Sequence, residues 1–177
     1  GTLSLPAIPY SRLEYKVWSS PGARIENSPP ETAPFLDVAE LEKDQSWSSV
    51  KRLALEITKG VRGDAAKASA IERYLKANYG YTLSPETGKG STPLEDFLFY
   101  TKAGYCEHFA TAMAVMLRAA GIPSRLVTGF TQGDWNRLGG YFIIRLEDAH
   151  SWVEAYVKDA DGKAGWATFD PSPSAGR

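Results

Sequence analysis

The 177-residue sequence contains a single cysteine, Cys106, and only two histidines, His108 and His150. One cysteine excludes an internal disulfide, and it also excludes zinc and iron–sulfur sites built from several thiolates. Basic and acidic residues are balanced at 20 against 21, so the chain lacks the positive excess that neutralises phosphates. No stretch approaches the ~18 apolar residues of a membrane-spanning helix. We therefore expect no nucleic-acid partner and no membrane span within this sequence.

The composition is that of a folded domain with a substantial core. Hydrophobic residues make up 43% and charged residues 23%, which are ordinary values for globular proteins. We expect a main domain over residues 41–177 and an extended, proline-containing lead-in over residues 1–40, in which residues 13–18 alternate like a short strand. The start at Gly1 and the loop-like end at 171–177 indicate a piece cut from a longer protein.

Helical patterns precede strand-like patterns along the chain. Apolar residues spaced three and four apart predict helices near residues 48–59, 64–78, 93–100 and 106–120. Runs of strand-forming residues follow at 124–131, 140–146, 151–158 and 166–169. Asp64 is expected to be an N-cap, and Gly121 is expected to end the central helix. This order predicts an α+β fold in which helices pack on an antiparallel sheet.

Cys106 is expected at the start of the central helix. The positive end of the helix dipole and the unpaired backbone N–H groups there stabilise negative charge on the sulfur. Gly104 allows the chain to approach closely just before the helix begins. These features suit a nucleophile, whereas the alternative is a buried cysteine that acts only as a small hydrophobic residue.

His150 and Asp170 are placed to assist a nucleophile. His150 lies at the head of one predicted strand, and Asp170 directly follows another. Histidine exchanges protons near neutral pH, and a carboxylate bonded to its far ring nitrogen fixes the tautomer. If the two strands are neighbours, the pair supplies a base and its orienting acid. The alternatives are a satisfied core histidine and an aspartate that starts an Asp-Pro turn.

Two metal-like patterns do not predict a metal site. Cys106, His108 and His150 lack a recognisable ligand spacing. Residues 159–162, Asp-Ala-Asp-Gly, look like half of a calcium-binding loop, but its twelfth position falls on Thr168 instead of an acidic residue. We expect a hairpin turn there, and we expect neither a metal nor a cofactor.

Three segments together resemble the motifs of a known family. They are Gly104-Tyr-Cys-Glu-His-Phe-Ala110, Asp148-Ala-His-Ser-Trp-Val-Glu154 and Trp166-Ala-Thr-Phe-Asp-Pro-Ser172. In this order they resemble the transglutaminase-like superfamily, in the form of the bacterial TgpA-type proteins, over about residues 50–172. The resemblance implies a papain-like fold with the nucleophile at the N-terminus of a central helix. It also implies a catalytic triad of Cys106, His150 and Asp170.

The resemblance implies protein-glutamine γ-glutamyl transfer. Cys106 would attack a glutamine carboxamide of a protein or peptide, and the resulting thioester would pass its acyl group to an amine. The Cys106 backbone N–H is expected to stabilise the oxyanion, and Tyr81 and Trp152 are candidates for a second donor or a substrate contact. The resemblance further implies that the full-length protein is anchored in the inner membrane with this domain in the periplasm. Calcium dependence is not indicated.

Two other functions remain open at this point. A cysteine peptidase or amidase that acts on protein or cell-wall peptides would use the same triad and would let water resolve the thioester. A catalytically silent interaction domain would need none of the three residues.

Overall fold

The computed structural model describes residues 32–39, 41–43, 46–86, 88–158 and 162–173. Most of the expected lead-in, including the strand predicted at 13–18, lies outside the described residues, as does most of the turn predicted at 159–162. Two short 3-10 helices come first, η1 (Ala33–Leu36) and η2 (Leu41–Lys43).

The helices agree in place with the expected ones but differ at their ends. They are α1 (Trp47–Ile57), α2 (Asp64–Asn78), α3 (Pro93–Glu95), the π-helical turn η3 (Asp96–Thr101) and α4 (Cys106–Ala119). Asp64 was expected to be an N-cap, which is wrong: it is the first helical residue, and Gly63 precedes it with a φ of 86°. The helix expected at 93–100 is also divided, because its α-helical turn widens into the π turn.

The central helix α4 ends in a Schellman motif, as Gly121 predicts. Gly121 has a φ of 78°, a conformation that glycine adopts without strain. Its N–H donates to the carbonyl of Arg118, and the N–H of Ile122 donates to that of Leu117. The chain then turns directly into the sheet, where the hydroxyl of Ser124 donates to the carbonyl of Ala114 at 2.8 Å. This closes the link between helix and sheet.

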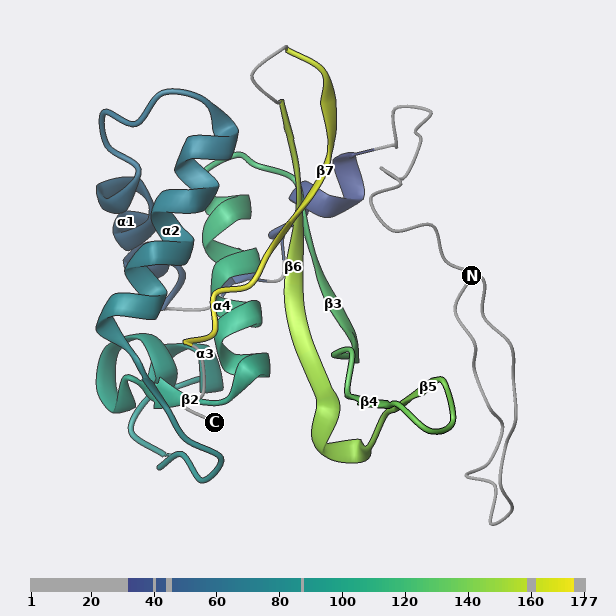
Figure 1. The fold of residues 1–177 in the computed structure, drawn as a ribbon. Helices are drawn as coiled ribbons and strands as arrows, with labels where there is room; N and C mark the ends of the chain where they lie inside the picture. Colours follow the sequence, from purple (N-terminus) through teal and green to yellow (C-terminus); the bar gives the residue numbers. More distant parts are fainter. Residues whose placement is uncertain (1–31, 40, 44–45, 87, 159–161, 174–177) are drawn as a thin grey trace.

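The main sheet is three-stranded and antiparallel, in the order β3 (Ser124–Phe130), β6 (Ala149–Lys158) and β7 (Ala164–Phe169). Along β6, alternate residues are buried, namely Ser151, Val153, Ala155 and Val157. This face packs on α4, whose core side chains include Phe109, Met113 and Met116. In Figure 1, α4 lies between the pair α1–α2 and the sheet. The expected α+β fold, with helices on an antiparallel sheet, is confirmed.

The strand expected at 140–146 differs from the prediction. Only β5 (Tyr141–Ile143) is extended, and it pairs with β4 (Asp134–Asn136) in a separate two-stranded hairpin. The residues that follow form the 3-10 turn η4 (Leu146–Asp148). The hairpin projects from the end of β3, beside the start of β6 (Figure 1).

A second small sheet connects two distant parts of the chain. The short strands β1 (Gly80–Tyr81) and β2 (Ala103–Gly104) pair in parallel, with Tyr81 opposite Gly104. Backbone hydrogen bonds of 2.8 Å run from Gly80 to Lys102 and from Thr82 to Gly104. The pairing places β1 beside β2, which ends two residues before the first residue of α4. In the part of the chain that is described, no helix is long and apolar enough to cross a membrane.

Candidate active site

Cys106 is the first residue of α4 and is partly exposed. Tyr105 precedes it in an extended conformation and gives the helix no side-chain cap. The sulfur therefore lies at the positive end of a 14-residue helix, whose middle, residues 112–117, is buried in the core. A thiol in this position is close to backbone N–H groups that stabilise a developing anion.

Tyr81 lies at the same place because β1 pairs with β2. Burial raises the pKa of its phenol, and the nearby charges of Cys106 and Asp170 raise it further. The backbone N–H of Cys106 approaches the phenol oxygen and acts in the opposite direction. The net raised pKa keeps this hydroxyl protonated near neutral pH, so it can donate a hydrogen bond. Tyr81 is thus near both Cys106 and Asp170, which are far apart in sequence.

His150 and Asp170 are in direct contact. The Nε2 atom of His150 lies 2.8 Å from Oδ2 of Asp170. The contact arises because β6 and β7 are neighbours, with Val153 opposite Phe169, and Asp170 directly follows β7. An ionised carboxylate accepts only, so Nε2 carries the proton and donates. The other ring nitrogen, Nδ1, is then left as the proton acceptor.

Asp170 is supported by a residue that the sequence reasoning missed. Its backbone N–H donates to Oε1 of Glu72 on α2 at 3.1 Å, and Lys76 holds the same oxygen at 3.1 Å. Its second carboxylate oxygen, Oδ1, accepts from the backbone N–H of Ser172 at 3.0 Å. In the sequence, Glu72 is one of several polar residues on a predicted helix, and no signal distinguishes it from its neighbours.

Trp152 forms a wall next to His150. The two rings lie nearly parallel, with centroids 6.3 Å apart and an interplanar angle of 24°. On the neighbouring strand, Gly129 is opposite His150, and a Cβ atom there would lie 2.8 Å from the Trp152 ring. The absence of a side chain at Gly129 therefore gives the indole its place. No interaction between Trp152 and Cys106 is seen in the described residues.

His108 lies on a different side of α4. Its ring packs edge-on against Tyr105, with centroids 4.4 Å apart, and fills the space next to Gly104, where a Cβ would lie 2.8 Å from it. Burial lowers the pKa of this imidazole, so it is neutral near pH 7. Together with Phe97 and Thr111 it lines a pocket of about 280 Å³ beside the first turn of α4.

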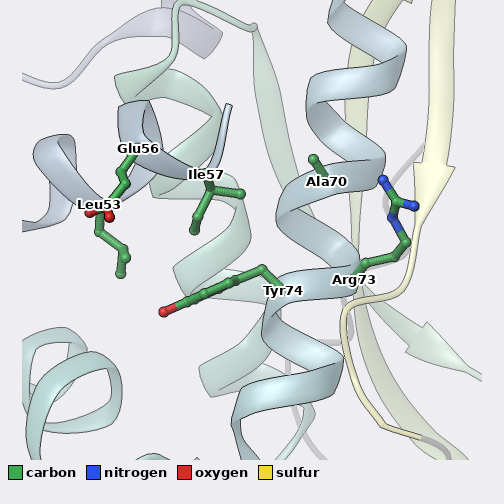
Figure 2. A pocket seen from close by; sticks show the side chains of 6 residues that line it. All are labelled: Leu53, Glu56, Ile57, Ala70, Arg73 and Tyr74. Carbon is green, nitrogen blue, oxygen red and sulfur yellow. The ribbon is translucent and has the colours of Figure 1, made fainter. Parts of the chain in front are cut away.

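A second pocket lies between α1 and α2, away from these residues. Figure 2 shows Tyr74 of α2 reaching toward Leu53 and Ile57 of α1 across it. None of the side chains that line it belongs to the group around Cys106. This groove therefore contains none of the site residues predicted from the sequence.

The sequence profile of the Transglutaminase-like superfamily matches residues 51–171, which is more than half of the chain. The chain belongs to the transglutaminase-like superfamily. The matched region begins in α1 and ends just after Asp170, so it contains Cys106, His150 and Asp170. The resemblance seen in the sequence motifs is thereby confirmed.

Two related proteins show where in the superfamily the similarity lies. A protein-glutamine gamma-glutamyltransferase of Pseudomonas aeruginosa is 41% identical over 108 residues, which cover 61% of this chain and 15% of that protein. The Bacillus subtilis protein YebA is 38% identical over 133 residues, which cover 70% of this chain and 17% of that protein. The chain therefore spans only about a sixth of the length of these relatives.

A solved structure shares the fold over most of the chain. The periplasmic domain of TgpA from Pseudomonas aeruginosa superposes with a TM-score of 0.68 at 33% identity, covering 81% of this chain and 49% of that one. The chain thus corresponds to about half of that periplasmic domain. The transglutaminase-like fold described above is shared with it.

Proposed function

We propose that this domain is a transglutaminase-type acyltransferase in which Cys106 is the nucleophile, His150 the acid–base and Asp170 the residue that orients His150. The observation that carries the proposal is the 2.8 Å contact between His150 and Asp170, with Tyr81 close to both Asp170 and Cys106. The relative in Pseudomonas aeruginosa that carries the name protein-glutamine gamma-glutamyltransferase supports the substrate class. The donor is a glutamine of a protein or peptide, and the acceptor is an amine.

In the first half-reaction, the sulfur of Cys106 forms a bond to the carboxamide carbon of glutamine. His150 takes the thiol proton on Nδ1 and then gives it to the amide nitrogen as the C–N bond breaks. Ammonia leaves, and a thioester remains on Cys106. Throughout this half-reaction, the carboxylate of Asp170 accepts a hydrogen bond from the Nε2–H group of His150. This hydrogen bond stabilises the imidazolium that forms while His150 holds the thiol proton.

In the second half-reaction, an amine attacks the thioester carbon. His150 removes the proton of the amine, and the C–S bond breaks to return the thiol and release an amide. If water attacks instead, the product is glutamate, which is the outcome of an amidase. The order of the two steps predicts ping-pong kinetics.

The oxyanion of each step needs donors aimed at it. We propose the backbone N–H of Cys106 and the hydroxyl of Tyr81, because the two approach each other and the raised pKa of Tyr81 keeps it protonated. One well-placed donor contributes about 10²–10³ in rate. Trp152 is proposed as a substrate wall and not as a donor to the oxyanion.

The experiment that tests the triad is incorporation of a fluorescent primary amine into casein. Cys106→Ala and His150→Ala are expected to abolish incorporation, and Asp170→Asn is expected to reduce kcat by about 10³–10⁴, as for other orienting carboxylates. Asp64→Asn, a carboxamide change on the exposed start of α2, is the matched control and should retain activity. Full activity of Cys106→Ala would exclude the covalent route.

A second measurement separates transfer from hydrolysis. Ammonia release from casein is followed with and without added amine, and the product is analysed by mass spectrometry. A transferase gives an adduct whose yield increases with amine concentration. Ammonia release with no adduct at saturating amine would instead assign the domain to the amidases or peptidases.

We also propose that residues 41–177 form the catalytic domain and that the complete protein is membrane-anchored with this domain in the periplasm. The similarity to the periplasmic domain of TgpA supports this location. Fractionation of cells that express the complete protein, with protease access from the periplasmic side, tests it.

A further inference from the structure

Exposed apolar side chains are concentrated in residues 131–148, the segment between β3 and β6 that contains β4 and β5 and is called the arm below. The arm is about a tenth of the chain, yet it carries half of the exposed large hydrophobic side chains among the described residues. These are Trp135, Leu138, Tyr141, Phe142, Ile144 and Leu146. None of them belongs to the hydrophobic core. Exposed apolar clusters of this kind commonly mark binding surfaces.

The arm is held together by its own contacts. Trp135 is opposite Phe142, and their ring centroids are 4.8 Å apart. Asp134, at the start of β4, pairs at 2.6 Å with Arg145, which follows β5. The side chain of Asn136 accepts two backbone N–H bonds of 3.0 Å in the turn that follows. The two aromatic rings are therefore presented on a built hairpin while remaining about half exposed.

Both ends of the arm join the sheet next to His150. Gly129, opposite His150, and Phe130, opposite Ala149, are the last paired residues before the arm. The N–H of Thr131 then donates to the carbonyl of Asp148 at 2.8 Å and closes the base. Trp135 is six residues beyond Gly129 along the chain, so the two lie at most about 20 Å apart. An extended peptide reaching from His150 to the aromatic rings thus needs about six residues at most, at about 3.3 Å each.

The arm also carries exposed charged side chains, among them Arg137 in the turn. The acidic residues Asp134 and Glu147 both lie next to Arg145, at 2.6 and 3.9 Å. Their charges are largely compensated within the arm, which leaves the aromatic faces as its main recognition feature. A partner that binds here should supply apolar side chains.

We infer that Trp135 and Phe142 bind an apolar segment of the polypeptide substrate, a few residues away from the reacting glutamine. The inference rests on the proposed function and deepens it, because the arm would select protein substrates by their sequence around the glutamine. The continuity of the arm with the strand of His150 favours the substrate as the occupant. Contact with the rings would lower the KM of a long substrate without changing the bond-making steps.

The test compares a long and a short substrate. Trp135→Ser/Phe142→Ser is expected to raise the KM for casein about tenfold and to leave its kcat within about twofold. The kinetics of a blocked glutaminyl dipeptide, too short to reach the arm, should be unchanged. Leu55→Ser is the matched control, because Leu55 is 50% exposed on α1 and remote from the arm.

Binding measured without turnover makes the test independent of activity. Casein binding to Cys106→Ala is compared with and without the arm substitutions by isothermal titration calorimetry, and a weaker affinity with the arm substitutions is expected. Unchanged affinity overturns the inference, and so does an equal loss of activity on the dipeptide. A wild-type dimer that the arm substitutions dissociate in analytical ultracentrifugation also overturns it in favour of a second copy. If no variant turns over either substrate but casein affinity still depends on the arm, the proposed function fails and the binding surface stands.

Discussion

Asp170 is held at three of its atoms, each by a different part of the chain. Its Oδ2 contacts His150, its Oδ1 accepts from Ser172, and its backbone N–H donates to Glu72. A carboxylate with a single hydrogen bond could rotate about its side-chain torsions. The hydrogen bond from the Asp170 backbone N–H to Glu72 on α2 restricts the backbone that carries this carboxylate. We therefore regard Glu72 as a positioning residue for the proposed triad.

Loss of the Glu72 contact should slow the reaction without weakening substrate binding. Glu72→Ala is expected to reduce kcat about tenfold, equivalent to ~1.4 kcal/mol in the activation free energy, with little change in KM. Glu72→Gln should largely restore kcat, because its amide oxygen can still accept from Asp170. Steady-state amine incorporation measures both parameters. A loss in KM alone, or no rescue by glutamine, would contradict the positioning role.

The residues of the proposed triad could be predicted from the sequence, whereas their support could not. Cys106, His150 and Asp170 belong to motifs of characteristic order and composition. Glu72 is recognisable only once α2 is seen beside the end of β7. Tyr81 was predicted only as a candidate second donor or substrate contact, because its place beside Cys106 depends on a parallel pairing of two-residue strands that no periodicity reveals.

The loop that follows β1 is held by the carboxylates of Asp96 and Glu95, of which Asp96 accepts more backbone hydrogen bonds. Asp96, at the start of η3, accepts backbone N–H bonds from Gly88 and Lys89 at 2.9 Å and from Gly90 at 2.5 Å. A Cβ atom on Gly90 would lie 2.9 Å from the Asp96 nitrogen, so the close approach requires glycine. The loop connects the strand of Tyr81 with the segment leading to Cys106, and its order therefore affects both.

This carboxylate predicts an acid-sensitive contribution to stability. The Gly88 hydrogen bond, with those from Gly90 and Lys89, holds the pKa of Asp96 below its ordinary value. The stabilisation is present above the unfolded-state pKa of ~3.9 and is lost as the pH falls through the lowered folded-state value. Asp96→Asn should therefore unfold at lower urea concentration than the wild type at pH 7, with a smaller difference near pH 3.

Urea titrations followed by circular dichroism at the two pH values measure this difference. Glu86→Gln is the control, because its carboxylate is largely exposed on the same loop. A difference between Asp96→Asn and the wild type that grows on acidification would contradict the prediction.

Whole elements were predictable where a long amphipathic pattern exists. The alternation along β6 and the apolar spacing along α4 gave the right type of element. The π turn at η3 escaped because its widened hydrogen bonding depends on packing and not on local propensity. In the arm, β4 escaped and β5 was predicted too long, because three-residue strands carry too little periodicity.

The molecule is organised around one helix with neighbours on both sides. α4 packs on α1 and α2 on one side and on β3 and β6 on the other. The proposed nucleophile Cys106 is at one end of this helix, whose position depends on this packing. We therefore expect core stability and site geometry to be lost together.

A cavity in the middle of α4 should destabilise the whole domain. Met113 is fully buried in the core, and Met113→Ala is expected to cost about 2–5 kcal/mol of the free energy of unfolding. Urea unfolding followed by near-ultraviolet circular dichroism and by loss of amine incorporation measures it. The two probes should shift together, whereas two separate transitions would show that helices and sheet unfold independently. Leu55→Ala, on the exposed side of α1, should change the stability little.

The closed base of residues 131–148 has a consequence for redesign. The Thr131–Asp148 hydrogen bond and the Phe130–Ala149 pair bring the two ends of the segment together. The residues between these ends are therefore topologically an insert in the sheet. Such an insert can be exchanged as a cassette, with a longer or differently sequenced hairpin spliced between fixed endpoints. Target preference could then be reprogrammed while the reaction centre is left untouched.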